Sequence, residues 1–503
     1  MQHFNLLQKN YTMKFKKITI SLIVTILFFS SCHDNFLEEK VYSNITPLNF
    51  YSTEQDAKAA LTSVYSAMRE QGAWRRQIIL AAEYPSEATW PNFSGEAWRT
   101  EMDQYTWTES STGFYQIWSS LFVMINRANT VLTYIDKIDF TTSSLKEQII
   151  GETRFLRGLA YLYLIRFYEN VPLMTEANMD EFEATNKGTS DDVWNLIFDD
   201  FEYAKSNLKV KYTGEDIGRA TSGAAQTMLV KAYISYAGRP WNKTEYWNKA
   251  ATEAKSVIDN AAYGYDLEDD YERVFLLENE HSSEYIFSVE YISNKGVGWD
   301  WPTFTGIRSG DQIKLDGWSS LTAEPEFFNT MNINDKRRGK TFVLSYQGFN
   351  DPSTTYTYPG NISLPHYNKY IDRADVGSGT GDYALNFYIT RFSDVLLMYS
   401  EAENEVNGPT EKSVYGVNRV RGRAGLEPFK ASDYNKESLR EAIYQERLWE
   451  LCAEGHAWFD MKRMDLMTKR IEKFNVEEKH YVFPIPQNEM DANPNLTQNQ
   501  GYN

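Results

Sequence analysis

The chain has 503 residues, a formal net charge of -18 at pH 7, two cysteines, and 15% aromatic residues, among them 13 tryptophans. The acidic charge disfavours nucleic acid and anionic lipid surfaces as partners, and two cysteines supply no cysteine cluster for a zinc site. We expect this many aromatic side chains either to be buried in a core or to form a binding surface.

The N-terminal 31 residues have the layout of a secretory signal. Three lysines precede an apolar run of 12 residues, 18–29, and two serines follow it. A membrane-spanning helix needs ~20 apolar residues, so we expect residues 1–31 to be a signal peptide that is removed. Met13 directly precedes the basic residues, so Met1 and Met13 are alternative start positions.

The cysteine that follows this segment suggests a lipid anchor. Cys32 would become the first mature residue, as in a bacterial lipoprotein, and we expect it to be lipidated; an ordinary secretory signal with an incidental cysteine is the alternative. Cys452 then has no disulfide partner and is expected to be a small buried side chain. Residues 1–31 hold four lysines and no acidic residue, so their removal changes the net charge from -18 to -22.

Helical periodicity predicts about four pairs of amphipathic helices along the chain. Thr53 with Asp56, and Ser144 with Glu147, have the spacing of capping boxes, and Pro172 marks a helix stop. Small residues recur where helices must approach closely, as in tetratricopeptide-like helix pairs. The predicted pairs are 53–70 with 114–138, 144–168 with 190–208, two helices within 221–262 joined by a Gly-Arg-Pro turn, and 391–408 with 412–426.

Residues 263–390 interrupt this order. They are rich in Gly, Asn, Asp, Ser, Pro and Tyr and contain short strand-like runs such as "EYIFSVEYI" at 284–292. The segment is longer than a structureless loop within a compact domain should be. We therefore predict an insertion of loops and small strands that carries a functional surface.

The tryptophans divide into two groups. Those at 118, 194, 247, 449 and 458 fall on predicted helices and are expected in the core, whereas five others lie in loops among Gly, Pro, Asn and Asp. A rigid ring with polar neighbours can stack on the apolar face of a sugar while amides and carboxylates bond its hydroxyls. The predicted ligand-binding set is Trp299, Trp301 and Trp318, helped by Trp90, Asn92 and Trp98; the alternative is that the rings only pin long loops.

Signals for catalysis or for a cofactor are weak. The six histidines are scattered, without a His-x-x-x-His pair, so we expect no metal site. "DVGSGTGD" at 375–382 lacks the lysine and the helix of a phosphate-binding loop. Carboxylate pairs are abundant because acids are abundant, and we expect no catalytic residue and no cofactor.

Several stretches along the chain carry a family resemblance. They are the cysteine expected to be lipidated, "ETRFLRGLAYLYLIRFYENVPL" (152–173), "RFSDVLLMYSEAENEVNG" (391–408), "VNRVRGRAGL" (417–426), "AIYQERLWELCAEGHAWFDMKRM" (442–464) and "FPIPQNEMDANPNLTQNQGYN" (483–503). In these stretches the chain resembles the SusD/RagB family of surface nutrient-binding lipoproteins of Bacteroidota. Gln500 departs from the family's usual Pro before the final Gly-Tyr.

The resemblance implies a mainly α fold, with four tetratricopeptide-like pairs as the scaffold and an irregular region that holds the ligand. It implies regions at 32–262, 263–390 and 391–503. It also implies a lipid-anchored protein on the outer face of the outer membrane that captures a glycan and passes it to a SusC-like TonB-dependent transporter. A peptide-binding member of the family, a glycan-cleaving hydrolase and a scaffold for protein partners alone are the alternatives.

Overall fold

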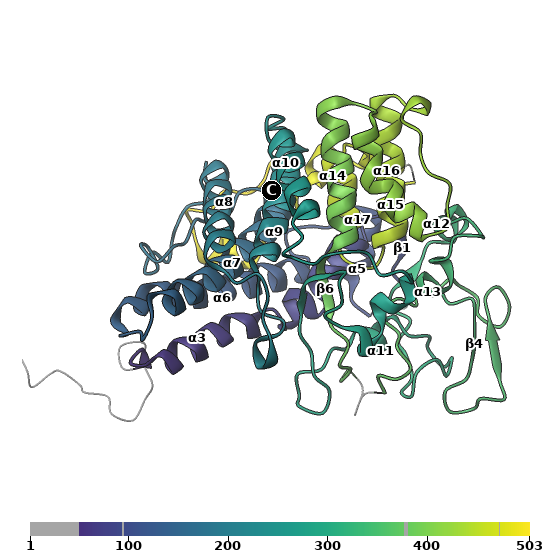
Figure 1. Ribbon diagram of the computed structural model, residues 1–503, viewed down its shortest axis with the longest axis horizontal. Coiled ribbons are helices and arrows are strands. Elements are labelled where there is room, and N and C mark those ends of the chain that lie inside the picture. The colour runs from purple at the N-terminus through teal and green to yellow at the C-terminus, as the bar shows by residue number, and fades with distance from the viewer. Residues whose placement is uncertain (1–49, 93–94, 377–380, 472, 503) are drawn as a thin grey trace, which may run out of the picture. The chain divides into compact units, whose positions relative to one another are not determined.

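In the part of the chain that the computed structural model describes, residues 50–92, 95–376, 381–471 and 473–502, eight long helices form four packed pairs (Figure 1). Consecutive pairs also touch, because α6 packs on α7, α8 on α9 and α10 on α14. The pairs are α3 (Glu54–Ala67) with α6 (Thr112–Tyr134), α7 (Ser143–Tyr168) with α8 (Ser190–Asn207), α9 (Ser222–Ala237) with α10 (Tyr246–Asp259), and α14 (Phe392–Asn407) with α15 (Glu411–Arg423). The predicted mainly α fold with tetratricopeptide-like pairs is confirmed.

Side-chain caps fix the starts of α3, α7, α9 and α15. The predicted capping box of Thr53 and Asp56 is present, and Thr221 caps α9 by accepting the Ala224 N–H. The predicted box of Ser144 and Glu147 is wrong. Thr142 is extended and accepts the Leu145 N–H, so α7 begins at Ser143. A threonine just before the helix supplied the cap that we had assigned to the serine.

The region between α10 and α14 consists of short elements linked by long loops. Its strand β2 (Tyr285–Val289) pairs antiparallel with β6 (Phe387–Arg391), and β4 (Ser345–Gln347) pairs with β5 (Thr355–Thr357). β3 (Thr322–Ala323) pairs with β1 (Thr89–Trp90), which lies far earlier in the chain. The short helices here are α11 (Trp301–Thr305), α12 (Pro325–Thr330) and α13 (Arg338–Thr341).

Helices outside the four pairs complete the described structure. They are the long helix α16 (Lys436–Leu451) and the shorter α4 (Gln77–Glu83), α5 (Ala97–Gln104), α17 (Ala457–Arg463), α18 (Met467–Arg470) and α19 (Gln487–Ala492). Residues Tyr51–Asn503 form one compact unit, and the division into regions 32–262, 263–390 and 391–503 stays a prediction about the order of the chain. The predicted signal peptide and Cys32 lie outside the described residues.

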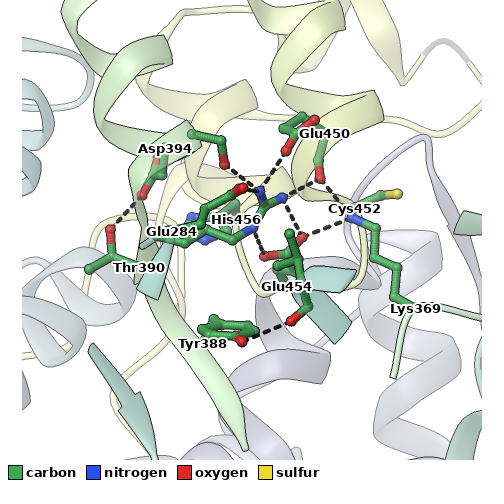
Figure 2. Close-up of polar contacts among 12 residues, drawn as sticks. Glu284, Lys369, Tyr388, Thr390, Asp394, Glu450, Cys452, Glu454 and His456 are labelled. Carbon is green, nitrogen blue, oxygen red and sulfur yellow. Dashed lines mark hydrogen bonds and ion pairs between the residues drawn. The ribbon is translucent and has the colours of Figure 1, made fainter. Parts of the chain in front are cut away.

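Charged residues of the C-terminal stretches are buried in an ionic network. Figure 2 shows Glu284, Glu450 and Glu454 among the residues of this network, and Lys369 bonds Glu454 at 2.8 Å. Arg391 donates to all three carboxylates, and its Nε lies 2.8 Å from Glu454 Oε2. Burial opposes the charge of Glu450, but Arg423, Arg391 and Arg337 outweigh it and lower the pKa of its carboxyl. The network joins β2 and β6 to the helix α16 and the loop after it.

A second buried network lies beside the first. Asp394, at the start of α14, bonds Lys231 of α9 at 2.8 Å and Arg447 of α16 at 2.9 Å. Arg447 also bonds Asp460 of α17 at 2.7 Å. Each of these charges is almost fully buried, and each has an opposite charge in contact, as buried charges require. Arg391 and Arg447 therefore hold the scaffold together.

Candidate functional site

Trp299 and Trp301 lie inside the protein, in a stack of four aromatic rings. The rings of Tyr291, Trp299, Trp301 and Phe304 follow one another with centroid distances of 5.4, 5.8 and 5.5 Å and interplanar angles of 10, 4 and 10°. Trp299 is 0% exposed and Trp301 is 1% exposed. Neither ring has a free face for a ligand, which corrects the expectation that both line a sugar-binding surface.

The local structure explains this correction. In an extended segment Trp299 and Trp301 would point to the same side, but Trp301 is the first residue of α11 and Pro302 follows it. The backbone of Trp299 is paired with that of Tyr383, and its indole N–H donates to the Arg75 carbonyl at 2.9 Å. Chain segments distant in sequence therefore cover the rings, and the insertion has a core of its own.

Trp98 is also a core residue. It is 2% exposed, it lies on α5, and its indole N–H donates to Glu96 at 2.8 Å. The start of α6 packs on its ring, because a Cβ built on Gly113 would lie 2.5 Å from the ring. The expectation that Trp98 faces a ligand is therefore corrected as well.

Trp318 does reach the surface. It is 38% exposed, and its ring meets Phe304, the last ring of the stack, edge-on at 6.4 Å. The backbone N–H of Trp318 donates to the Thr303 carbonyl at 2.8 Å. The ring thus rests on the buried stack while part of it faces solvent.

A polar cavity of about 660 Å³ opens beside Trp318, and we call it the Trp318 pocket. Its lining includes Glu96, Arg99, Arg308, Asp316, Trp318 and Ser320. Guanidinium, carboxylate and hydroxyl groups here can donate to and accept from hydroxyl groups, and the ring can cover an apolar face. This combination suits a polyhydroxylated ligand.

Arginines hold the aromatic wall of the pocket in place. The Arg76 guanidinium lies 5.6 Å from the Trp318 ring centroid and 5.2 Å from that of Phe304, and it forms an ion pair with Asp300. Arg99 lies 4.9 Å from the Phe304 centroid and bonds Glu96 at 2.8 Å. Cation–π contacts and ion pairs therefore fix both rings before any ligand arrives. Arg76 and Arg99 were not predicted as site residues from the sequence. The available signal was a neighbouring arginine or tryptophan, in "WRRQ" and "AWRT".

Trp90 is exposed as well, at the end of β1. It is 46% exposed, its backbone pairs with Thr322, and the Lys473 ammonium lies 5.9 Å from its ring centroid. Asn92 is half-buried and donates its backbone N–H to the Trp90 carbonyl at 3.0 Å. Trp318 lies four residues before Thr322, so the β1–β3 pair brings Trp90 and Trp318 to one region of the protein. Of the predicted set, Trp318, Trp90 and Asn92 remain candidates.

Within the described residues, we find no group of three His, Cys, Asp or Glu side chains arranged to hold a metal ion. Among the helices of this part of the chain, none has the length and apolar character that a membrane span needs. Cys452 is fully buried at the end of α16, as predicted, and burial raises the pKa of its thiol to about 12.

Comparisons with known proteins place the chain among the SusD-like proteins. Residues 283–502 match the SusD family, and residues 35–234 match a family described as "Starch-binding associating with outer membrane". SusD-like protein P2 of Formosa agariphila is 27% identical to this chain, and the alignment covers 97% of this chain and 100% of the relative. A SusD-like protein of Bacteroides ovatus is 26% identical, and its alignment covers 89% of this chain and 82% of that relative.

Solved structures agree with these matches. A SusD superfamily protein from Parabacteroides distasonis superposes with a TM-score of 0.78 at 26% identity, covering 89% of this chain and 99% of that one. A laminarin-binding SusD-like protein superposes with a TM-score of 0.76 at 24% identity, covering 90% and 100%, which shows the shared fold. The chain belongs to the SusD/RagB family.

Proposed function

We propose that this protein captures an oligosaccharide at the cell surface. The observation that carries the proposal is Trp318, a ring 38% exposed on a rigid aromatic base at the edge of a polar cavity of about 660 Å³. The proposal is supported by membership of a family with a matching model described as starch-binding and associated with the outer membrane. Capture, delivery and the lipid anchor are parts of this proposal.

The expected contribution of Trp318 follows from its exposed area. A tryptophan side chain offers roughly 250 Å², so 38% exposure leaves about 95 Å² that a sugar can cover. At ~25 cal/mol per Å² this is at most ~2.4 kcal/mol, and ordering of the glycan consumes part of it. We expect Kd values between roughly micromolar and millimolar, and a loss of about tenfold or more on truncation of the ring.

Calorimetry with defined probes tests the proposal. Maltoheptaose, laminarihexaose and a casein peptide digest are titrated into the wild type, Trp318→Ala and Phe182→Ala. Phe182 is a matched control, because it is an exposed aromatic side chain, at 89%, that does not line the Trp318 pocket. We expect a glycan to bind wild type and Phe182→Ala equally and Trp318→Ala more weakly. Binding of peptides alone would favour the peptide-binding alternative.

A hydrolase is the enzymatic alternative, and the pocket gives it little support. A glycosidase needs one carboxyl group as an acid and a second as a base or nucleophile. Glu96 already accepts from Trp98 and Arg99, and Asp316 accepts the Ser309 N–H. Both carboxylates therefore hold the pocket together. Incubation with each glycan should release no new reducing ends, and their appearance would revive this alternative.

The lipid anchor rests on the sequence around Cys32. Each buried CH₂ of an acyl chain contributes ~0.8 kcal/mol, so several chains on one cysteine would hold the protein permanently on the outer membrane. Replacement Cys32→Ala should release the protein from the membrane fraction of cells. A variant that stays in that fraction would contradict lipidation.

Delivery requires a partner, and we propose a SusC-like TonB-dependent transporter that this protein covers as a lid. A stable complex should bury well over ~1,600 Å² in total. An affinity-tagged copy, purified in mild detergent from its native membrane, should bring a large β-barrel protein with it. Recovery of the tagged protein alone, under conditions that preserve other complexes, would count against this partner.

A further inference from the structure

A second cavity lies close to Trp90, and we call it the Trp90 pocket. Its volume is about 260 Å³, and its lining combines the apolar side chains of Phe327 and Ile471 with the polar ones of Glu87, Glu324, Glu326, Gln445, Arg470 and Lys473. Lys473 joins the cavity to Trp90, because its ammonium lies 5.9 Å from the ring centroid while it also bonds Glu324. Trp90, like Trp318, is thus an exposed ring close to a cavity that has charged groups in its lining.

Polar groups at the base of the Trp90 pocket lack good partners within the protein. The Nε2 of Gln445 and the Nε of Arg470 are buried and have no hydrogen-bond partner among the described residues. The contacts that do exist are long, at 3.4 Å between Arg470 and the Gln445 carbonyl oxygen and 3.5 Å between Arg470 and Glu87. Unsatisfied buried donors are costly, so the pocket is suited to a ligand that accepts from them. Sugar hydroxyls both accept and donate.

The charges of the two pockets favour an uncharged ligand. In the Trp318 pocket Arg99 is paired with Glu96, and in the Trp90 pocket Arg470 is paired with Glu87 and Lys473 with Glu324. Glu326 adds a further carboxylate to the Trp90 pocket. A sulfate or carboxylate on a sugar would have to compete with these carboxylates for their cations, whereas a neutral sugar would not.

The strand β3 connects the two pockets. Ser320 lines the Trp318 pocket, Glu324 lines the Trp90 pocket, and β3 lies between them. Four residues span at most ~14 Å, and Trp90 is held against this segment by its pairing with Thr322. A chain of several sugar units can therefore reach from one exposed ring to the other.

We propose that the Trp90 pocket is a second sugar-binding position, and that an uncharged glycan long enough to reach from Trp318 to Trp90 occupies both positions. This inference rests on the proposed glycan-binding function. It adds that affinity rises with chain length and that the two rings act on different parts of one ligand.

Calorimetry with a length series tests the inference. Maltose and maltoheptaose, laminaribiose and laminarihexaose, and polygalacturonate fragments as a charged probe are titrated into wild type, Trp90→Ala, Trp90→Phe and Trp318→Ala. We expect Trp90→Ala to weaken binding of the long neutral chain about tenfold and to leave the disaccharide unaffected. Trp90→Phe should restore most of the loss, and Trp318→Ala should weaken both lengths.

A second variant guards against an indirect effect of Trp90 on β1. Gln445 Nε2 has no partner in the described structure, and Gln445 Oε1 makes only the long 3.4 Å contact with Arg470. Gln445→Met should therefore change the melting temperature little while it weakens binding of the long chain. Phe182→Ala is again the control. Equal loss for long and short chains, or no loss in Trp90→Ala and Gln445→Met, would overturn the second position while leaving the proposed function intact. Binding of charged fragments alone would also overturn it, and no binding of any glycan would overturn both.

Discussion

Replacement of Trp301 by alanine should destabilise the protein rather than only weaken a binding site. Trp301 is 1% exposed and stacks between Trp299 and Phe304 at 5.8 and 5.5 Å. Truncation of a buried tryptophan costs ~3–5 kcal/mol, because it removes apolar burial and leaves a cavity. Trp318→Ala removes a ring that is 38% exposed, so we expect it to cost only about 1 kcal/mol.

The difference is measurable as a melting temperature. Residues Tyr51–Asn503 form one unit of about 450 residues, and at about 2.1 cal/mol/K per residue its unfolding entropy is roughly 0.9 kcal/mol/K. Trp301→Ala should therefore lower the Tm by about 3–5 °C and Trp318→Ala by about 1 °C, as followed by calorimetry or by circular dichroism. If Trp301→Ala melts with the wild type while Trp318→Ala falls by several degrees, the assignment of core and surface rings is wrong.

Three further variants probe the scaffold. Arg391→Met removes a cation that three buried carboxylates share, and denaturant unfolding should show a loss of ~3–5 kcal/mol. An unchanged midpoint would mean that Arg391 contributes nothing to stability. His456 is buried, and burial lowers its pKa from 6.5 to about 3. The unfolded state therefore takes up a proton first as the pH decreases, so stability should fall below about pH 6.5 by up to roughly 1.4 kcal/mol per pH unit. In His456→Asn this part of the pH dependence should be absent when urea unfolding at pH 7 is compared with urea unfolding at pH 5.5. Gly416→Ala would place a Cβ 2.0 Å from the Leu396 carbonyl oxygen where α14 and α15 meet, so its Tm should fall even though helix propensity alone predicts a gain of up to ~1 kcal/mol.

The helical scaffold could be predicted because its signals are local. Apolar spacing of 3.6 residues and caps such as Thr53 lie within each helix, and all four predicted pairs are present. The error at Ser144 is of the same local kind, since Thr142 offers an equally good cap two residues earlier. The buried charges are harder to place, because the carboxylates that meet Arg391, at positions 284, 450 and 454, are each at least 59 residues away from it in the sequence.

The binding surface could be predicted only in part, because the exposure of a ring is a tertiary property. Trp299 and Trp318 lie in similar polar, glycine-containing stretches, yet one is 0% and the other 38% exposed. The rings that cover Trp299 include Tyr370 and Phe387, about seventy to ninety residues later in the chain. A nearby Gly or Pro carries no information about such partners.

The buried tryptophans still bear on function through the rings that they support. Trp318 rests on Phe304, Phe304 on Trp301, and Trp301 on Trp299, so the exposed ring is fixed by a stack that reaches into the core. Arg76 holds the same surface from the side through its pair with Asp300. A ring that is already ordered loses little entropy when a sugar covers it, so more of the ~2.4 kcal/mol of surface burial remains for affinity. Substitution of a buried ring of the stack should therefore lower stability and affinity together. Truncation of Trp318 or Trp90 at the surface should instead lower affinity with little change in stability.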